Sequence, residues 1–313
     1  MRLLVVFYKF NQYICSIRIS MERIIKCILI IILLATFNEV QSQRLFIHLE
    51  GGTVNYGGDL QDKIFTFNQA NNFIGAGLYY NLSDHIAIEG SLSTGKLAAS
   101  DAKSNTANAR RNLSFYSNIS EASLLVRANL WNIPADKKFT PYATMGVAVF
   151  HYDPYAYTLS GTKVYLRPLR TEGEGLPQYP DRKLYNLNQI AIPFGFGVTY
   201  AISDNFMVGA EINFRKTFTD YIDDVSSQRY ADTAILRSLR GDLSAKMSFR
   251  SDETSDPYTF SDRITRGNPD KKDAYYSCVM KLYISLDNLF SSSSNSSEAK
   301  RNRKQMDCPK KVL

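Results

Sequence analysis

The feature that most constrains the fold is a strict alternation of bulky apolar residues with small or polar residues from Asn188 to Ala201. Because successive side chains of a β-strand point to opposite faces, this stretch predicts a strand with one apolar and one crowded face. The two faces comprise Ile190, Ile192, Phe194, Phe196, Val198 and Tyr200 on one side, and Ala191, Pro193, Gly195, Gly197, Thr199 and Ala201 on the other. Both faces are explained if the apolar face contacts lipid and the crowded face lines a narrow lumen.

The same alternation recurs along the chain. The next segment repeats it, with outward residues Phe206, Val208, Ala210, Ile212 and Phe214 against inward residues Gly209, Glu211, Asn213 and Arg215. Further strands are predicted at Leu45–Tyr56, Phe73–Leu82, Ile86–Gly95, Ile119–Trp131, Tyr142–Tyr152 and Tyr275–Asp287. We therefore expect an all-β fold, an OmpA-like, eight-stranded antiparallel transmembrane β-barrel, since an even strand number is typical of such barrels.

The predicted connections are of two kinds. Short polar turns occur at Leu82–His85, Ile133–Lys138 and Ile202–Asn205. Long polar loops occur at Gly57–Asn72, Lys96–Tyr116, Asp153–Leu187 and Lys216–Ala274. Outer-membrane barrels have short periplasmic turns and long extracellular loops, so the asymmetry predicts an outer-membrane location with membrane lipids as neighbours.

The two ends of the chain are predicted to lie outside the barrel. A positively charged stretch precedes an apolar run at residues 28–35, and small polar residues end at Ser42, as in a secretory signal. The predicted division is a signal region at 1–42, in which Met21 is a candidate for the true start, a barrel at 43–290, and a disordered, serine-rich basic tail at 291–313.

The basic charge of the chain is concentrated at these ends. The sequence has 37 Lys and Arg against 30 Asp and Glu, a net charge of +7. Residues 1–42 contribute five basic and two acidic residues and residues 291–313 contribute six and two, which leaves 26 of each sign between them. The barrel region therefore lacks the basic footprint of a nucleic-acid-binding protein. Two cysteines lie after the signal region, Cys278 and Cys308, and they indicate neither a disulfide framework nor a zinc site.

Strand parity places seven charged residues on inward faces, namely Glu50, Glu89, Glu121, Arg127, Glu211, Arg215 and Lys281. An eight-stranded barrel is wide enough only for its own side chains. We therefore expect these charges to be paired in an ionic plug that serves packing, rather than in a conduit, a proton relay or a ligand site.

Two further expectations concern the strands. Pro193 should produce a bulge or an irregular upper strand, because a closed barrel has no edge to accommodate a proline. Aromatic residues near the predicted strand ends should form interfacial girdles, namely Tyr79, Tyr80, Trp131, Tyr142, Phe150, Tyr152, Tyr200 and Phe218.

Some loop residues invite a chemical interpretation. Thr171–Gly175 would suit a turn near a ligand, and Thr219–Val225 offers three carboxylates for calcium, but neither has the spacing of an EF-hand loop. His151, close to Asp153, is the candidate for an outer-membrane enzyme, yet its parity faces lipid, where an amphipathic ring in the girdle is the simpler explanation. We therefore predict no catalytic residue, metal, cofactor or small-molecule substrate.

Several motifs resemble one family, the barrel component of the type IX secretion system of gliding and periodontal Bacteroidota, often called PorG and grouped as DUF6089. The motifs are Tyr56-Gly57-Gly58-Asp59-Leu60, Arg111-Asn112-Leu113-Ser114-Phe115 with Ile119-Ser120-Glu121, Phe139-Thr140-Pro141-Tyr142 with Gly146, Leu169-Arg170-Thr171-Glu172-Gly173-Glu174-Gly175, Ile192-Pro193-Phe194-Gly195, and Thr219-Asp220-Tyr221-Ile222-Asp223-Asp224-Val225-Ser226. The resemblance covers nearly all of the chain after the signal region.

This resemblance implies a non-enzymatic subunit of a protein-export machine that anchors or assembles a periplasmic ring built from the lipoprotein PorK and its partner PorN. The surfaces that would face such a ring are the tail and the turn residues Ser83, Asp84, Pro134, Asp136, Lys137, Ser203, Asp204 and Asn205. A generic structural or adhesion barrel that binds through its long loops is the alternative, and a small enzyme using His151 is a second.

Overall fold

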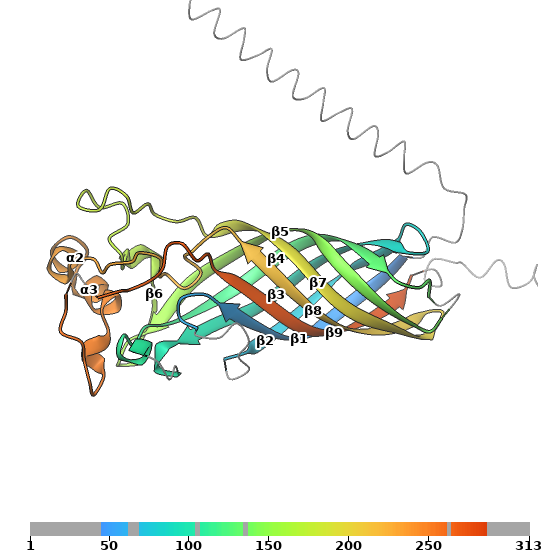
Figure 1. Cartoon of the computed structure of the whole chain (residues 1–313), viewed down its shortest axis with the longest axis horizontal. Coiled ribbons are helices and arrows are strands. Elements are labelled where there is room, and N and C mark those ends of the chain that lie inside the picture. The colour runs from blue at the N-terminus through green and yellow to red at the C-terminus, as the bar shows by residue number, and fades with distance from the viewer. Residues whose placement is uncertain (1–44, 62–68, 104–106, 134–136, 262–263, 287–313) are drawn as a thin grey trace, which may run out of the picture. The chain divides into compact units, whose positions relative to one another are not determined.

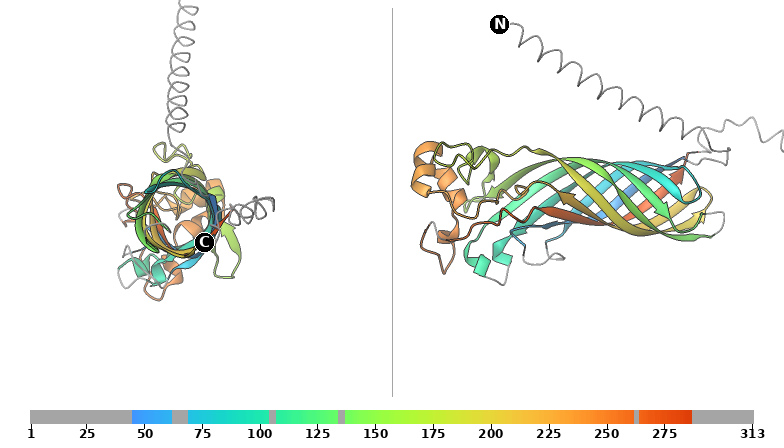
Figure 2. Two further views of the ribbon diagram at one scale, coloured as in Figure 1. Left: turned by 90° about the vertical axis from the view of Figure 1, so that its right-hand side faces the viewer. Right: turned by 45° about the horizontal axis from the view of Figure 1, so that its top comes forward.

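The chain forms a closed antiparallel barrel in this computed structural model, which describes residues 45–61, 69–103, 107–133, 137–261 and 264–286. The wall consists of β1 (Leu45–Gly57), β2 (Asn71–Asn81), β3 (Ile86–Ser100), β4 (Ser114–Asn129), β5 (Phe139–Tyr157), β7 (Asn188–Ser203), β8 (Phe206–Thr217) and β9 (Ala274–Ser285). Each strand pairs with the next in this order, and pairing of β1 with β9 closes the ring, which Figure 2 shows end-on. The eight-stranded barrel predicted from the sequence is confirmed.

The remaining elements lie in the long connections at one end of the barrel (Figure 1). They are β6 (Lys163–Tyr165), which pairs with the end of β5, the helices α2 (Thr233–Arg240) and α3 (Asp242–Ser248), and the single 3₁₀ turns Asp101–Lys103, Ala107–Arg110, Arg167–Leu169 and Ser251–Glu253. The connections at the opposite end are shorter, with four residues between β2 and β3 and two residues between β7 and β8 (Figure 1). In the described part of the chain, no helix is long and apolar enough to cross a membrane.

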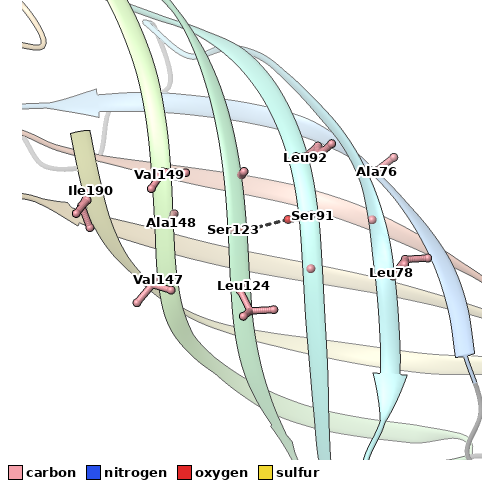
Figure 3. Close-up of a pocket in the computed structure, with 13 residues that line it drawn as sticks. Ala76, Leu78, Ser91, Leu92, Ser123, Leu124, Val147, Ala148, Val149 and Ile190 are labelled. Carbon is pink, nitrogen blue, oxygen red and sulfur yellow. Dashed lines mark hydrogen bonds between the residues drawn. The ribbon is translucent and has the colours of Figure 1, made fainter. Parts of the chain in front are cut away.

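The outer wall of the barrel is apolar. Leu92 is 70% exposed and Phe196 is 64% exposed, whereas Ser93 and Gly195, inward neighbours on the same strands, are buried. Figure 3 shows the outer face of β2–β5, where a shallow hollow of about 750 Å³ has an almost entirely apolar lining. Leu78, Leu124 and Val147 are among the side chains that line it. Exposed apolar area of this extent is unfavourable in water and favourable against acyl chains, so this wall is a lipid-facing surface.

Some strands extend further than predicted at the loop end. β3 continues to Ser100 and β4 begins at Ser114, so that these two residues face each other at the top of one hairpin. β5 continues to Tyr157. Two of the predicted loops are therefore longer than the observed ones, namely Lys96–Tyr116 and Asp153–Leu187. The cause is that backbone pairing continues above the apolar belt, where the alternation used to place strand ends has already faded.

Pro193 does not cause the predicted bulge. Its pairing with Arg215 of β8 is regular, and the register shift in that hairpin lies between Ala201 and Ser203. On the other side of β7, pairing with β5 stops at Phe194 and resumes in the same register at Ala191. The expected irregularity is thus a local lapse of pairing, which accommodates a residue without an N–H donor.

The predicted aromatic girdle is wrong for four of its members. Tyr79, Tyr142, Phe150 and Tyr152 are buried, with exposures of 4% or less, because their strand parity points them inward. Tyr200 and Phe218 are exposed, as predicted. At the turn end, Lys137 lies 4.2 Å from the Trp131 ring, which is a suitable pair for a membrane interface.

Candidate functional site: the lumen network and the loop cap

Lys281 forms the central crossing of the barrel interior. Its Nζ donates to Glu89 on β3 and, at 2.9 Å, to Glu211 on β8, and lies 3.7 Å from Glu50 on β1. Strands β3 and β8 are four positions apart in a ring of eight, so this ammonium group joins opposite walls. Tyr142 also donates to Glu211, at 2.9 Å. These side chains cross the lumen at this level.

A second crossing lies nearer the loop end. Arg215 on β8 forms an ion pair with Glu121 on β4 at 3.2 Å, and donates to Ser277 at 2.5 Å. Tyr275 on β9 donates to Glu121 at 2.5 Å. Strands β4 and β9 again lie on opposite sides of the ring. Each polar group of this crossing therefore has a partner that comes from another part of the wall.

The third crossing, nearer the turn end, differs from the prediction. Arg127 was expected to be paired with a carboxylate, but it donates to Tyr283 (2.8 Å), Thr199 (2.7 Å) and Asn129 (2.8 Å). Its guanidinium carbon lies 3.4 Å from the centre of the Tyr142 ring. Cation–π contact and neutral acceptors thus stabilise this buried charge. All seven predicted inward charges lie inside the barrel, and we call them the lumen network.

His48 lies beside the lumen network and is fully buried. Its Nε2 is 3.6 Å from Glu89, and neither ring nitrogen has a hydrogen-bond partner. Within the described residues, His48, Glu50 and Glu89 are the three side chains whose donor atoms come close enough together to hold a metal ion. The Lys281 ammonium is bonded to the same carboxylates and already supplies positive charge there.

The long loops meet in a second buried polar cluster. Tyr56, at the top of β1, places its hydroxyl 2.6 Å from carboxylate oxygens of both Asp223 and Asp273. The Asp273 carboxylate also accepts from the backbone N–H of Ile222 at 2.8 Å. One tyrosine therefore connects the first strand to both ends of the long connection between β8 and β9.

Glu172 and Asp224 connect the third loop to the fourth. The Glu172 carboxylate is fully buried and accepts from the backbone N–H groups of Ser226 (2.9 Å) and Ser227 (3.0 and 2.9 Å). It also lies 3.4 Å from Arg266. Asp224 accepts from Thr171 and Tyr185, each at 2.6 Å. Of the three carboxylates that Thr219–Val225 offers for calcium, those of Asp223 and Asp224 accept from separate protein donors.

Arg111 brings the second loop into this cluster. It forms a bidentate pair with Asp101, with both distances at 2.7 Å, and donates to the backbone carbonyls of Asp59 (2.9 Å) and Arg266. We call the whole cluster the loop cap, which comprises Tyr56, Asp59, Asp101, Arg111, Thr171, Glu172, Glu174, Tyr185, Asp220, Asp223, Asp224, Arg266 and Asp273. A continuous apolar core under it contains Phe115 and Tyr275 of the wall and Ile222 and Met247 of the loops. The loops are therefore packed onto the mouth of the barrel.

Several acids of the loop cap hold their protons unusually strongly. Burial, reinforced by Asp224 and Glu172, raises the pKa of Glu174 to about 8. Burial raises the pKa of Asp224 to about 7 and that of Asp220 to about 6, although Arg266 and Ser226, respectively, oppose these shifts. The pKa of Asp223 is raised well above its ordinary value by burial and by the neighbouring Asp273. Proton binding thus relieves part of the negative charge of the cap.

A family model described as a domain of unknown function, DUF6089, matches residues 23–262 of this sequence. The chain belongs to the DUF6089 family. No curated protein matches it.

Solved barrels resemble this DUF6089 chain at low identity. Neisserial surface protein A is 7% identical with a TM-score of 0.39, and the match covers 77% of this chain and 96% of that one. The attachment invasion locus protein Ail of Yersinia pestis is 7% identical with a TM-score of 0.36, covering 78% and 100%. OprG of Pseudomonas aeruginosa is 8% identical with a TM-score of 0.35, covering 78% and 94%. Likeness at this level says nothing about function.

The turn residues predicted to contact a ring lie at the end opposite the loop cap. Ser83, Asp84, Lys137, Ser203 and Asp204 are exposed and Asn205 is half-buried, whereas Pro134 and Asp136 lie outside the described residues. Local bonds define two of the turns, with Ser83 Oγ accepting from Ile86 N–H (3.1 Å) and Ser203 Oγ accepting from Asn205 N–H (3.3 Å). The predicted signal region and basic tail are also outside the described residues.

His151 is on the exposed face of β5, as its parity predicted. Its Nδ1 lies 2.8 Å from the side-chain oxygen of Asn188, so its hydrogen-bond partner is an amide and not a carboxylate. A general base oriented by an acid would need the latter arrangement. This geometry does not favour catalysis by His151.

Sequence reasoning found only part of the DUF6089 loop cap. Gly57, Gly58, Asp59, Thr171, Glu172, Gly173, Asp220, Tyr221, Asp223 and Asp224 were singled out as family loop motifs, and they lie in or beside the cap. Gly173 has a φ of +77°, as a tight turn there requires. Tyr185, Arg266 and Asp273 were missed because their partners are 39 or more residues away in sequence. Asp101 was missed as well, although its partner Arg111 is ten residues away.

Proposed function

We propose that this barrel is a non-enzymatic outer-membrane subunit of a type IX protein secretion machine, in which it anchors or assembles the periplasmic ring of PorK and PorN. The observation that carries the proposal is the set of side chains that crosses the lumen from wall to wall. Lys281 connects β3 with β8, and Tyr275 connects β9 with β4. A barrel filled in this way acts through its surfaces, which suits an anchor better than a conduit.

The distribution of family motifs also supports the proposal. Three motifs that carry the resemblance supply the core of the loop cap through Tyr56, Glu172 and Asp223. A rigid cap at the extracellular end leaves the periplasmic turns as the accessible surface for a ring. Those turns present both signs of charge, with Asp84 and Asp204 exposed beside Lys137. Such groups suit polar contacts at a protein interface.

Deletion of the gene and affinity purification of the tagged barrel test the proposal together. We expect deletion to block export of type IX cargo, and we expect PorK and PorN to co-purify with the barrel from gently solubilised outer membranes. The triple change D84A/K137A/D204A should lower this recovery while the barrel stays folded. The matched variant R237A/D242A/K246A changes exposed charges at the extracellular end and should not lower it. Normal export after deletion would refute the proposal.

A structural or adhesion barrel is the second candidate. Its support is the exposed Leu239 and Leu243, which the helices α2 and α3 display on top of the cap. In this candidate, the two leucines supply apolar contacts to the bound surface. In that case L239S/L243S should abolish binding to cells or cell-wall material, and deletion of the gene should leave export intact.

A further inference from the structure

Four tyrosines and two lysines gather on the outer wall at the loop end of β3–β6. The tyrosine rings of Tyr116, Tyr155, Tyr157 and Tyr165 lie 5.4–5.9 Å from their neighbours in the group, and Tyr116 and Tyr155 are stacked. Lys96 Nζ lies 4.6 Å from the Tyr116 ring, and Lys163 Nζ lies 3.9 Å from the Tyr155 ring. We call this group the tyrosine–lysine patch. It plays no part in the lumen network or the loop cap.

A small pocket adjoins the patch. It has a volume of about 150 Å³, and its lining includes Gln69, Asn71, Ser100, Lys103 and Tyr116. The pocket is bounded by Tyr116 of the patch, and Lys103 adds a third ammonium group beside it. A polar pocket that shares a wall with stacked aromatic rings suits a sugar ring carrying hydroxyl groups.

The charge of this region is positive. Lys96, Lys103 and Lys163 face it, and the nearby carboxylate is that of Asp153, close enough to interact with Lys163. The Lys163 side chain is fully exposed. An anionic group is therefore the complementary ligand, and phosphate is one that lysine binds as a point charge.

The height of the patch above the lipid-facing belt determines which anionic groups can reach it. On β5 the belt ends near Val149, and Tyr155 follows six residues later. On β4 Tyr116 precedes the outward Ala122 by the same number of residues. At about 3.3 Å per residue and a strand tilt of about 40°, the patch lies about 15 Å above the belt. The polar layer of a phospholipid leaflet is only about 5–8 Å deep, so a phospholipid headgroup would not reach it.

We infer that the tyrosine–lysine patch and its pocket bind the phosphorylated sugar headgroup of a glycolipid in the outer leaflet. The exposed rings of Tyr157 and Tyr165 and the half-buried ring of Tyr116 pack against the C–H faces of the sugars, and the lysines pair with the phosphates. Tyr155 is only 4% exposed and supports the other rings from below. The outward direction of the patch puts this ligand in the membrane beside the barrel, with its acyl chains against the apolar wall. The inference requires a barrel with its loops outside the cell, and it is independent of the proposed secretion role.

Native mass spectrometry of the detergent-solubilised full chain tests this inference. The probes are rough lipopolysaccharide, the same molecule after removal of its phosphates, phosphatidylglycerol, and soluble glucose 6-phosphate. We expect rough lipopolysaccharide to bind tightest, and the triple variant K96Q/K103Q/K163Q to weaken that binding by about tenfold or more, since each lysine near a membrane surface is worth about fivefold. A heat-shift gel verifies that each variant remains a folded barrel.

The matched control is K183Q/K216Q/K246Q, which removes three exposed lysines elsewhere and should bind like the original chain. Tyr116→Leu with Tyr165→Leu should weaken binding of the phosphorylated and the dephosphorylated glycolipid alike, because stacking does not need phosphate. Equal binding of phosphatidylglycerol would overturn the inference in favour of a general anionic surface. Equal binding of glucose 6-phosphate would overturn it in favour of a soluble ligand, and equal losses in both lysine variants would leave no specific site.

Discussion

The lumen network and the loop cap are both buried and charged, but they balance their charge differently. The lumen network has Glu50, Glu89, Glu121 and Glu211 against Arg127, Arg215 and Lys281, so each acid lies close to a base or to a chain of donors. In the loop cap, the described acids outnumber the buried bases, with Asp59, Asp101, Glu172, Glu174, Asp220, Asp223, Asp224 and Asp273 against Arg111 and Arg266. The barrel interior therefore relies on ion pairs, whereas the cap must also rely on protons.

The Tyr56 hydroxyl illustrates the second strategy. It lies 2.6 Å from both Asp223 and Asp273, but a hydroxyl has a single hydrogen to donate. Two short bonds are satisfied together when one carboxyl is protonated and donates to the tyrosine oxygen. Burial raises the pKa values of both acids well above the ordinary range, which agrees with a shared proton. The cohesion of the cap therefore depends on pH.

The largest expected effect comes from removing the cation of the lumen network. Lys281→Met leaves Glu89 and Glu211 buried without their shared ammonium, which should cost about 3–5 kcal/mol of unfolding free energy. Denaturant unfolding in detergent, followed by fluorescence of the single tryptophan, measures the loss. Lys246→Met is the control, because Lys246 is exposed and should change stability by less than about 0.5 kcal/mol.

A loss below about 1 kcal/mol would contradict an ion-paired interior. The double variant E89Q/K281M sharpens the test. If Glu89 and Lys281 stabilise each other, the double variant should be more stable than the sum of the two single losses predicts.

A smaller and more local effect is expected in the loop cap. Arg266→Met removes the guanidinium near Glu172 (3.4 Å) and its bond to Thr171 (2.8 Å). Because backbone amides still bond Glu172, the cost should be about 2–3 kcal/mol, expressed as opening of the loops. Limited proteolysis should cut the loops faster while the unfolding midpoint of the barrel stays unchanged. Arg237→Met, at an exposed ion pair, should have no such effect, and a lowered barrel midpoint in R266M would refute a separate cap.

The contrast between the two regions also explains what the sequence could predict. Period-two alternation identified every wall strand and the inward parity of all seven lumen charges, because a strand fixes which face each residue occupies. Applied consistently, the same parity would have placed Tyr79 and Tyr152 inside the barrel and not in a girdle. Parity shows which side chains point into the lumen, but it does not show their height along the barrel axis. Partners across the lumen could therefore not be assigned.

The loop cap was beyond such reasoning. Tyr56 and Asp273 are 217 residues apart, and Arg111 bonds the carbonyl of Arg266 across 155 residues. Irregular loops have no period from which to infer contacts. The available signal was compositional, since Thr219–Val225 contains three acidic residues and no base, and it suggested calcium or solvation. Burial under an apolar core turned the same acids into hydrogen-bond acceptors and proton carriers.

The third expected effect is the pH dependence of the cap. The folded pKa values of Glu174, Asp224 and Asp220, about 8, 7 and 6, lie above the ordinary values of about 4, so the folded cap binds more protons than the open one. This stabilisation is complete below pH about 4 and is lost as the pH rises through 6 to 8. Hydrogen exchange at Ser226 and Ser227, corrected for intrinsic rates, should lose protection by up to tenfold per pH unit for each proton released.

Glu174→Gln should flatten this profile near pH 8, because the amide imitates the neutral acid and no longer releases a proton. Amides in the middle of β4 serve as the internal control, since they are held by wall pairing on both sides and should stay protected over the same range. Protection at Ser226 that rose with pH would mean that the cap acids are stabilised as carboxylates. The two regions would then balance charge in the same way, and the distinction between a paired interior and a protonated cap would fail.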